Sequence, residues 1–242
     1  MLYDCTLISR RSSPPVLSII IPCLNEAEGI ADTLTALAPL RARGVEVVVA
    51  DGGSEDKSAA LARPLADQVI TATRGRAMQM NAGAAQARGD ILLFLHADCR
   101  LPSAADGLIT DGLNRKQKTW GRFDVELTGH SPLLSMVGAL MNWRSRLTGV
   151  STGDQGLFVT RSLFEAVGGF PQIALMEDVA LSKHLKRYGS PLNLRHRMVV
   201  SGRRWEKHGV LRTLLLMWRL RLQFWLGADP GKLARRYVPH KL

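Results

Sequence analysis

Carboxylate side chains end two short apolar runs in the first hundred residues of the chain. Residues 45–50 lead into Asp51, and residues 91–95 lead into His96, Ala97 and Asp98. Each run has the length and composition of a buried strand in a parallel sheet. Ligands of open parallel sheets bind beyond the carboxyl ends of the strands. Carboxylates at that edge suit the base or ribose of a nucleotide and a divalent cation on its diphosphate, so they indicate an enzyme with an activated, diphosphate-linked substrate.

Polar groups that could hold a nucleoside follow the first two strands. Pro22 is expected to end the first strand, which places Asn25 and Glu26 in the loop above the sheet. Gly52 lets the backbone approach a ligand closely, and Asp51 can accept hydrogen bonds from a base or a ribose hydroxyl. A plain strand-to-helix turn with a capping side chain is the alternative for both loops.

Phosphate and metal chemistry is expected at two further positions. Arg76 begins a predicted helix, whose N-terminal dipole favours phosphate, and a guanidinium can bind phosphate through two hydrogen bonds. Asp98 can reach a Mg²⁺ or Mn²⁺ ion that bridges diphosphate oxygens, with His96 as a softer ligand or a polar wall. The alternatives are a solvated basic turn around Arg76 and an ordinary turn at Asp98.

The adjacent carboxylates Glu177 and Asp178 lie at the start of another predicted helix. One of them can act as a general base toward an acceptor hydroxyl. Alternatively, both carboxylates only complement the dipole of the helix. Residues 153–156, which include Asp154, precede a strand and can line the same cleft.

Strand and helix patterns alternate through the first hundred residues and position these side chains. The alternation predicts right-handed crossovers and an α/β fold, with a mostly parallel central sheet flanked by helices. Farther along, Phe123, Val125 and Leu127 alternate with Arg122 and Asp124, as in a half-exposed strand. The expected strands are residues 17–22, 45–50, 68–72, 91–95, 156–160 and 192–200; the expected helices are a segment from Ile30, residues 54–63 with Ser54 as the N-cap, and residues 76–88, 131–147, 178–188 and 209–226.

Positive charge is concentrated near the C-terminus. Of a net charge of +11, residues 195–242 carry +10, with 12 Lys or Arg against 2 Asp or Glu. Such asymmetry suggests a polyanionic partner: a phosphorylated ligand, nucleic acid or an anionic membrane surface. The helix over residues 209–226 has too few consecutive uncharged residues to span a bilayer, which needs about 20. Its Trp218, Phe224 and Trp225 suit a core or subunit contact, or a position on an anionic membrane.

Composition favours one folded domain in a reducing compartment. The 46% hydrophobic and 22% charged residues are ordinary for a globular protein, and 242 residues suit one domain with a C-terminal extension. Cys5, Cys23 and Cys99 fit neither a disulfide framework nor a zinc pattern, which favours the cytoplasm. Ser18 and Pro22 interrupt the apolar stretch over residues 16–24, so we interpret it as a core strand and not as a signal peptide.

The order of these motifs resembles the family 2 glycosyltransferases of the GT-A fold. The resemblance spans roughly residues 16–205 and rests on the motifs from Ser18–Pro22 to Glu177-Asp178. It implies a GT-A (Rossmann-like) domain over residues 16–205 and a basic amphipathic extension over residues 206–242, packed on that domain or on a membrane. Residues 74–81 and 201–205 resemble a small bacterial subfamily that is associated with radical-SAM enzymes and arsenosugar biosynthesis.

The resemblance implies a nucleotide-sugar donor, a divalent metal (Mg²⁺ or Mn²⁺) and an inverting transfer to an acceptor hydroxyl. Asp51 matches the family's nucleoside-binding Asp, Asp98 the metal-associated last Asp of its D-x-D motif, and Asp178 the base of its E-D motif. Arg204 would steady the leaving diphosphate. The expected catalytic residues are Asp178, Glu177 and Arg204, and the expected donor contacts are Pro22, Asn25, Glu26, Asp51, Gly52, Arg76, Ala97, Asp98 and Trp205.

Two departures from the family pattern favour the transfer of one sugar over polymerisation. His96 replaces the first Asp of D-x-D, and Ser201 replaces the Gln of the Q-x-x-R-W motif of processive members. The acceptor is not identified by the sequence. The basic helix suggests a lipid-linked acceptor and a peripheral location at the inner face of the cell membrane. The oligomeric state stays open.

Two rival functions remain. A nucleotidyltransferase acting on a sugar phosphate also needs a nucleotide, a metal and a parallel sheet, but the acidic loop over residues 22–29 lacks the Gly- and Arg/Lys-rich pattern expected for it. A non-enzymatic nucleic-acid or membrane-binding protein would be driven by the basic tail. Against it, the first 194 residues are nearly neutral, with 20 Lys or Arg against 19 Asp or Glu, so no nucleic-acid partner is expected.

Overall fold

The computed structural model describes residues 16–237, except for the side chain of Arg204. Residues 1–15, which include Cys5, and residues 238–242 lie outside the described part. The strands are β1 (Leu17–Cys23), β2 (Glu46–Asp51), β3 (Gln68–Thr71), β4 (Ile91–Phe94), β5 (Cys99–Arg100), β6 (Trp120–Thr128), β7 (Leu157–Thr160) and β8 (Leu192–Ser201). The helices are α1 (Ile30–Ala36), α2 (Ala38–Ala42), α3 (Ser58–Ala62), α4 (Arg76–Gln86), α5 (Ala105–Lys116), α6 (Leu133–Thr148), the 3₁₀ turn η1 (Gly153–Gln155), α7 (Arg161–Ala166), α8 (Glu177–Leu185), α9 (Arg203–His208), α10 (Val210–Trp225) and α11 (Pro230–Tyr237).

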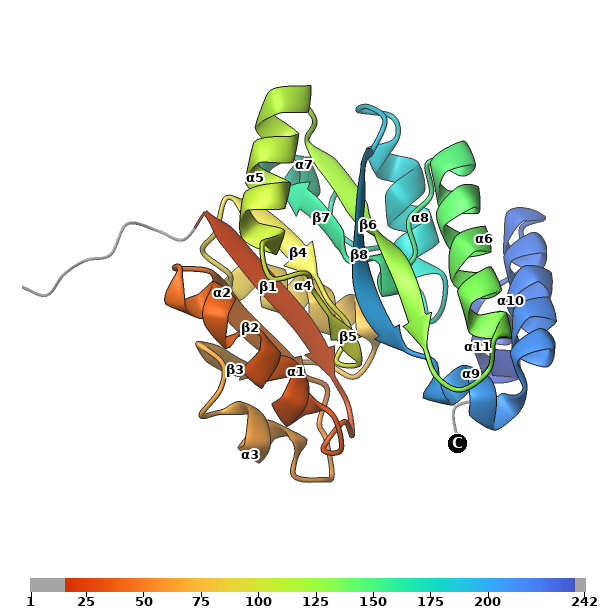
Figure 1. Ribbon diagram of the computed structural model, residues 1–242, viewed down its shortest axis with the longest axis horizontal. Helices are drawn as coiled ribbons and strands as arrows, with labels where there is room; N and C mark the ends of the chain where they lie inside the picture. The colour runs from red at the N-terminus through yellow and green to blue at the C-terminus, as the bar shows by residue number, and fades with distance from the viewer. Residues whose placement is uncertain (1–15, 238–242) are drawn as a thin grey trace, which may run out of the picture.

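The strands form one mixed sheet in the order β3-β2-β1-β4-β7-β6-β8-β5 (Figure 1). The neighbouring strands β3, β2, β1 and β4 pair in parallel, and so do β6 and β8. The pairings of β7 with β4 and β6, and of β5 with β8, are antiparallel. The α/β fold and the parallel first half are confirmed, but parallel pairing does not extend through the whole sheet. The regular strand–helix alternation that predicts crossovers stops after β4, and antiparallel pairings occur only beyond that strand.

Alternate residues of β1 face two different cores. Ile19 and Ile21 join a core that also holds side chains of α1, α2, α5 and α6. Ile20, between them, joins a second core with side chains of α4, α7 and α8. Figure 1 shows α1, α2 and α5 in front of the sheet and α4 behind it. Burial on both faces explains why the central strands are unbroken apolar runs in the sequence.

The first strand continues one residue beyond its predicted end. Pro22 lies inside β1 and pairs with Ala50 of β2, so it does not end the strand. The pairing of β1 with β4 stops at Ile20. The N–H that Pro22 lacks would face that open side, where no ladder hydrogen bond is lost.

The strand β6 is more buried than its alternating sequence predicts. Arg122 and Asp124, expected on an exposed face, are buried and form an ion pair with each other. Arg146 of α6 also pairs with Asp124. Asn142 of α6 accepts a hydrogen bond from the Val125 N–H at 2.8 Å and donates one to the Val125 carbonyl oxygen at 2.9 Å. These polar contacts hold α6 against β6 and provide hydrogen-bond and ion-pair partners for the buried Arg122 and Asp124.

The helices α10 and α11 pack on the segment that begins α8. Leu220 of α10 and Leu233 of α11 are buried with Leu175, Met176 and Val179. The neighbouring helices α10 and α6 are also in contact. In the part of the chain that the structure describes, no helix is long and apolar enough to cross a membrane.

Candidate functional site

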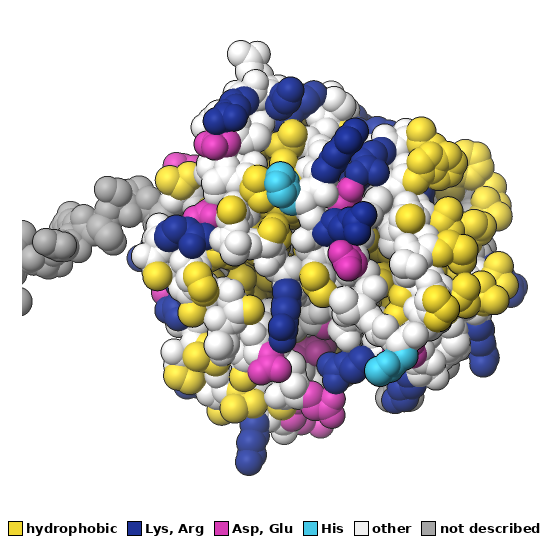
Figure 2. Space-filling model, viewed as in Figure 1, with side chains coloured by type: hydrophobic (Ala, Val, Ile, Leu, Met, Phe, Trp, Pro, Cys, Tyr) yellow, Lys and Arg dark blue, Asp and Glu magenta, His cyan; other side chains and the backbone are white. Residues whose placement is uncertain are grey.

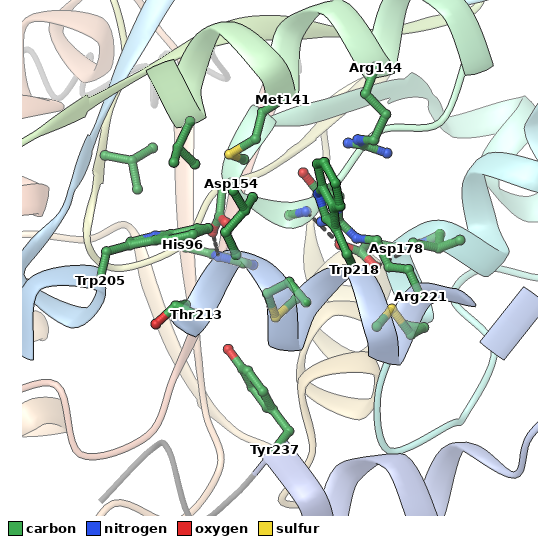
Figure 3. A pocket seen from close by; sticks show the side chains of 18 of the residues that line it. His96, Met141, Arg144, Asp154, Asp178, Trp205, Thr213, Trp218, Arg221 and Tyr237 are labelled. Atoms are coloured by element: carbon green, nitrogen blue, oxygen red, sulfur yellow. Dashed lines mark hydrogen bonds and ion pairs between the residues drawn. The ribbon is translucent and has the colours of Figure 1, made fainter. Parts of the chain in front are cut away.

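A cavity of about 440 Å³ lies between the end of the sheet and the helices α6, α8 and α10. Its walls carry residues from the segment after β4, from η1, from the starts of α4 and α8, and from α6, α9, α10 and α11. Figure 3 shows His96 and Trp205 on one side of this cavity and Arg144, Asp178 and Arg221 on the other. Five of the predicted site residues line it: Arg76, Asp98, Glu177, Asp178 and Trp205.

His96 is held between η1 and the strand end. Its Nδ1 lies 3.2 Å from Oδ1 of Asp154, and its ring packs on the backbone of Gly153. A Cβ at Gly153 would approach the ring to 2.4 Å, so a glycine is needed there for this arrangement. The Nε2 atom of His96 is buried with no hydrogen-bond partner among the described residues. The ring is therefore oriented by Asp154 on one side and has an unused nitrogen on the other.

The segment after β4 can hold a divalent cation. Ligand atoms of His96, Asp98 and Cys99 lie within 4.8 Å of one another. The unused Nε2 of His96 and the carboxylate of Asp98 fit an ion such as Mn²⁺, which accepts both imidazole and carboxylate. Burial raises the pKa of the Cys99 thiol well above its usual value, so this thiol is a protonated and weaker ligand.

Glu177 and Arg76 form a buried ion pair at the cavity wall. Nη1 of Arg76 lies 3.3 Å from Oε1 of Glu177, whose side chain is 3% exposed. Burial raises the pKa of Glu177, against the positive charge of Arg76, which lowers it. Burial works against the charge of Arg76, but Glu177, Tyr237, Asp178 and Asp154 together outweigh it, and the pKa of Arg76 is raised. Glu177 is thus engaged in fixing the first residue of α4.

Asp178 is the more accessible of the two adjacent carboxylates. Its side chain is half-buried and lines the cavity. Oδ2 accepts a hydrogen bond from the Gly153 N–H at 2.7 Å, and Oδ1 accepts one from the Val179 N–H at 2.7 Å. Each carboxylate oxygen has a further lone pair, so Asp178 is fixed in place and can still accept a proton from a ligand.

The predicted nucleoside contacts form a second group at the ends of β1 and β2. Asp51 accepts hydrogen bonds from Ser54 and from the Gly53 N–H, and Asn25 accepts one from the Glu55 N–H. Ser54 therefore joins the Asp51 turn and does not cap α3, which begins at Ser58. Asn25, Glu26 and Asp51 are not among the residues that line the cavity. The predicted nucleoside contacts and the cavity are therefore separate parts of the site.

Gly52 is required by close packing rather than by strain. A Cβ there would lie 2.9 Å from the side chain of Gln79, whose Nε2 donates to the carbonyl oxygens of Cys23 and Ala50. Gln79 is buried and ties α4 to the ends of β1 and β2. The glycine-rich turn after β2 thus fits both the nucleoside prediction and a structural role.

The remaining predicted residues have mixed surroundings. Glu26 donates its N–H to Oγ of Ser58 at 2.7 Å and lies beside the Asp51 group. Ala97 is buried, and its carbonyl oxygen accepts a hydrogen bond from Thr33. The backbone of Arg204 belongs to α9, but its side chain, on which the leaving-group prediction depends, lies outside the described part.

Sequence reasoning missed two arginines in the cavity. Arg144 of α6 and Arg221 of α10 both line it, together with Tyr237 of α11. Arg221 could have been noticed in the sequence, because it is a charged residue between the apolar Leu220 and Leu222. The pattern does not show what that side of the helix contacts. Arg144 follows Trp143 in an amphipathic helix, where a basic residue is ordinary.

Comparison with known families finds a match in the first half of the chain. Residues 18–126 match the family model of Glycosyl transferase family 2. This segment holds the first four strands, the Asp51 group and the candidate metal ligands. The half of the cavity made by α8 and α10 lies beyond the family 2 match.

Curated relatives are similar over most of the chain. The undecaprenyl-phosphate 4-deoxy-4-formamido-L-arabinose transferase of Pseudomonas paraeruginosa is 25% identical, covering 85% of this chain and 64% of the relative. The poly-beta-1,6-N-acetyl-D-glucosamine synthase of Staphylococcus aureus is 24% identical, covering 71% of this chain and 46% of the relative. The chain therefore spans less than two thirds of the length of either relative.

Solved structures share the fold. The mannosyltransferase PcManGT of Pyrobaculum calidifontis, in complex with GDP-Man and Mn²⁺, matches with a TM-score of 0.62 at 23% identity, covering 87% of this chain and 61% of that one. TarS residues 1–349 of S. aureus, in complex with UDP-GlcNAc, matches with a TM-score of 0.63 at 19% identity, covering 77% and 58%. The chain therefore shares the fold of these two proteins.

Proposed function

We propose that the protein transfers a single sugar from a nucleotide-diphosphate sugar to an acceptor hydroxyl, with a divalent metal and with inversion. One observation carries the proposal: the candidate metal ligands after β4 and the carboxylates that begin α8 line one cavity, in a chain whose first half matches family 2. The similarity to PcManGT in complex with GDP-Man and Mn²⁺ supports this choice of donor class and metal.

The residues then take the following roles. Asn25, Glu26 and Asp51 hold the nucleoside. His96 and Asp98 would hold the metal, which would supply positive charge for the leaving diphosphate. Asp178 accepts the proton of the acceptor hydroxyl as its oxygen attacks the anomeric carbon. The bond from that carbon to the diphosphate oxygen breaks on the opposite face, which inverts the configuration.

Arg76, in the Arg74-Gly75-Arg76 turn, has two roles: contact with the donor phosphate and an ion pair with Glu177. Arg76 begins α4 and is paired with Glu177, so it links the phosphate side of the site to the carboxylates of α8. Arg204, at the first turn of α9, steadies the leaving diphosphate with Trp205, which lines the cavity. Ser201, which replaces the Gln of the processive Q-x-x-R-W motif, supports a single transfer and not polymerisation.

A thermal-shift panel tests the donor class. UDP, GDP, ADP, CDP and dTDP are each added with and without Mn²⁺, because a ligand of the native state raises its stability by mass action. At 100 times Kd the gain is about 2.7 kcal/mol, which shifts the Tm of a chain of this size by roughly 5–11 °C. One or two nucleotides should give such a shift only with Mn²⁺. No shift with any of the five would contradict the proposal.

We further propose that residues 206–242 act as an extension that lies on an anionic membrane at the inner face of the cell membrane, where the acceptor is lipid-linked. The exposed face of α10 is an apolar stripe of Leu211, Leu215, Trp218, Leu222 and Trp225, each more than half exposed. Figure 2 shows hydrophobic side chains gathered over α10 and α6. Exposed Arg212 and Arg219 border the stripe. This combination of apolar and basic side chains is typical of an interfacial helix. The similarity to an undecaprenyl-phosphate transferase supports a lipid-linked acceptor.

Vesicle sedimentation tests the membrane proposal. Each basic residue near an anionic surface contributes about 1 kcal/mol, so the protein should sediment with anionic vesicles at low salt and less with neutral ones. Leu215→Glu places a charge in the stripe and should abolish sedimentation, whereas Leu61→Glu, at an exposed leucine of α3, should not. If the protein sediments with neither anionic nor neutral vesicles, the apolar stripe of α10 is covered by another subunit and not by a membrane.

A further inference from the structure

We propose that Arg144 and Arg221 form a phosphate subsite for the acceptor, so that the acceptor of the proposed transfer carries a phosphomonoester. The inference rests on the proposed function, because the bound molecule is an acceptor only if the protein transfers a sugar. Binding at the subsite itself can be tested without turnover. The two arginines come from different helices, α6 and α10, and both line the cavity that holds Asp178. Figure 3 shows them on the same side of the cavity, near Asp178 and Trp218.

The guanidinium groups have hydrogen-bonding capacity that the described residues leave unused. Nε and Nη2 of Arg144 and Nε of Arg221 are buried without a hydrogen-bond partner in the described part of the chain. Neither arginine takes part in an ion pair with a described carboxylate. Buried donors of this kind cost free energy unless a ligand or water meets them.

The electrostatics of the pair also favour an anion. Burial and, after it, the neighbouring positive charge of Arg221 lower the pKa of Arg144 to about 10, although the carboxylate of Asp178 acts in the opposite direction. Burial likewise lowers the pKa of Arg221. Both side chains stay cationic at neutral pH, so two like charges share a poorly solvated wall. A phosphomonoester, with a charge of about −1.5 to −2 at pH 7, would offset both charges and accept hydrogen bonds from both forks.

The donor diphosphate is a less fitting occupant for this pair. The candidate metal ligand His96 lies at the other side of the cavity, next to Trp205 of α9 (Figure 3). Arg76, the arginine that the sequence assigns to the donor phosphate, is already paired with Glu177. The base candidate Asp178 lies on the arginine side, where the acceptor must enter for attack opposite the leaving group.

The wall around the pair is apolar and continues to the exposed stripe of α10. Leu140 and Trp143 of α6 and Leu214, Met217 and Trp218 of α10 line the same cavity. Trp218 belongs both to this wall and to the exposed stripe. The phosphate of a lipid lying against the stripe could therefore reach the pair, and so could a small soluble phosphomonoester.

Calorimetric titration of the full chain separates these possibilities. The probes are farnesyl phosphate and glycerol 3-phosphate, added in the presence of Mn²⁺ and of the nucleoside diphosphate that gives the largest thermal shift, or of Mn²⁺ alone if none does. At least one probe should bind, and Arg144→Gln and Arg221→Gln should each weaken it at least tenfold. Arg115→Gln, which removes an equal charge from the exposed surface of α5, should leave binding unchanged.

The two sources give different patterns of affinity. Binding of farnesyl phosphate at least tenfold tighter than glycerol 3-phosphate assigns the phosphate to a lipid, and equal binding assigns it to a soluble acceptor. Arg144→Lys and Arg221→Lys keep the positive charge but lose the two parallel N–H donors of the guanidinium group. They should bind phosphate more tightly than the Gln variants and less tightly than the unchanged protein. They also serve if a Gln variant fails to fold.

Three results would overturn the inference. The first is that neither phosphomonoester binds, and the second is that binding persists in both Gln variants. The third is that the Mn²⁺-dependent nucleotide shift falls with the phosphate affinity in the variants, because the pair would then serve the donor. Failure of the proposed function would give a different result. No nucleotide would then bind, but the phosphate titrations would still test binding by Arg144 and Arg221.

Discussion

Replacing Asp178 by Asn tests the base that the geometry favours. The substitution keeps the shape of the side chain and removes the proton acceptor from the wall of the cavity. General-base catalysis contributes roughly 10²–10⁴-fold, so turnover should fall by that factor, which equals about 2.7–5.4 kcal/mol of transition-state stabilisation.

The same substitution has a structural cost that can be worked out separately. Asp178 accepts hydrogen bonds from two backbone N–H groups, those of Gly153 and Val179, each at 2.7 Å. Asn has one acceptor oxygen, so one N–H group would face the amide NH₂ and lose its partner. The loss of one buried hydrogen bond costs about 1–3 kcal/mol, which lowers Tm by roughly 2–12 °C. Turnover must therefore be assayed well below the lowered Tm.

The assay follows release of the nucleoside diphosphate from a saturating nucleotide sugar, with Kd for the nucleotide measured in parallel. Asp178→Asn should lower kcat with Kd little changed. Glu177→Gln is the matched control, since Glu177 is buried and paired with Arg76; it should weaken donor binding more than it lowers kcat. Near-full transfer by Asp178→Asn would refute the assignment and move the base to Glu177 or Asp154.

Two further predictions concern the metal and the stability of the sheet. Asp98→Ala should abolish the Mn²⁺ enhancement of nucleotide binding and leave the thermal unfolding of the free protein nearly unchanged; an unchanged enhancement would remove Asp98 from the metal site. Glu46 is buried, and although burial opposes its charge, hydrogen bonds from Ser18 and Arg88 outweigh this and lower its pKa. Its contribution to stability is therefore fully present above its unfolded pKa of about 4.5 and is lost as the pH falls through the lowered folded pKa. Glu46→Gln should lower the free energy of unfolding at pH 7 by on the order of 2 kcal/mol and flatten its fall in acid, as measured by urea unfolding across pH; an unchanged acid limb would contradict this.

Sequence patterns predicted the first half of the fold well because each signal there is local. The runs that became β1, β2 and β4 are buried on both faces, and burial leaves an unbroken apolar run. The second half depends on contacts between distant segments. Arg122 and Asp124 look exposed in the alternating pattern of β6, but Arg146 and Asn142 of α6 allow them to be buried.

The candidate site was predicted from the positions of carboxylates at strand and helix ends. Asp98 and Asp178 met in one cavity because the topology brings the end of β4 near the start of α8. The sequence did not reveal Arg144 and Arg221, since each lies in an amphipathic helix and only the packing of α10 near α6 brings both to the cavity. Helical periodicity gives the direction of a side chain relative to its own helix and not the partner that it meets.

Analysis of the phosphate products tests the central claim most directly. The protein is incubated with Mn²⁺ and each nucleotide sugar whose diphosphate stabilises it, together with a phosphomonoester that binds, and the products are followed by phosphorus NMR. The proposed function predicts release of a nucleoside diphosphate, dependent on Asp98 and Asp178. A parallel incubation contains nucleoside triphosphates and a sugar phosphate. Release of pyrophosphate there, with no diphosphate from any nucleotide sugar, would contradict the glycosyltransferase assignment and support a nucleotidyltransferase.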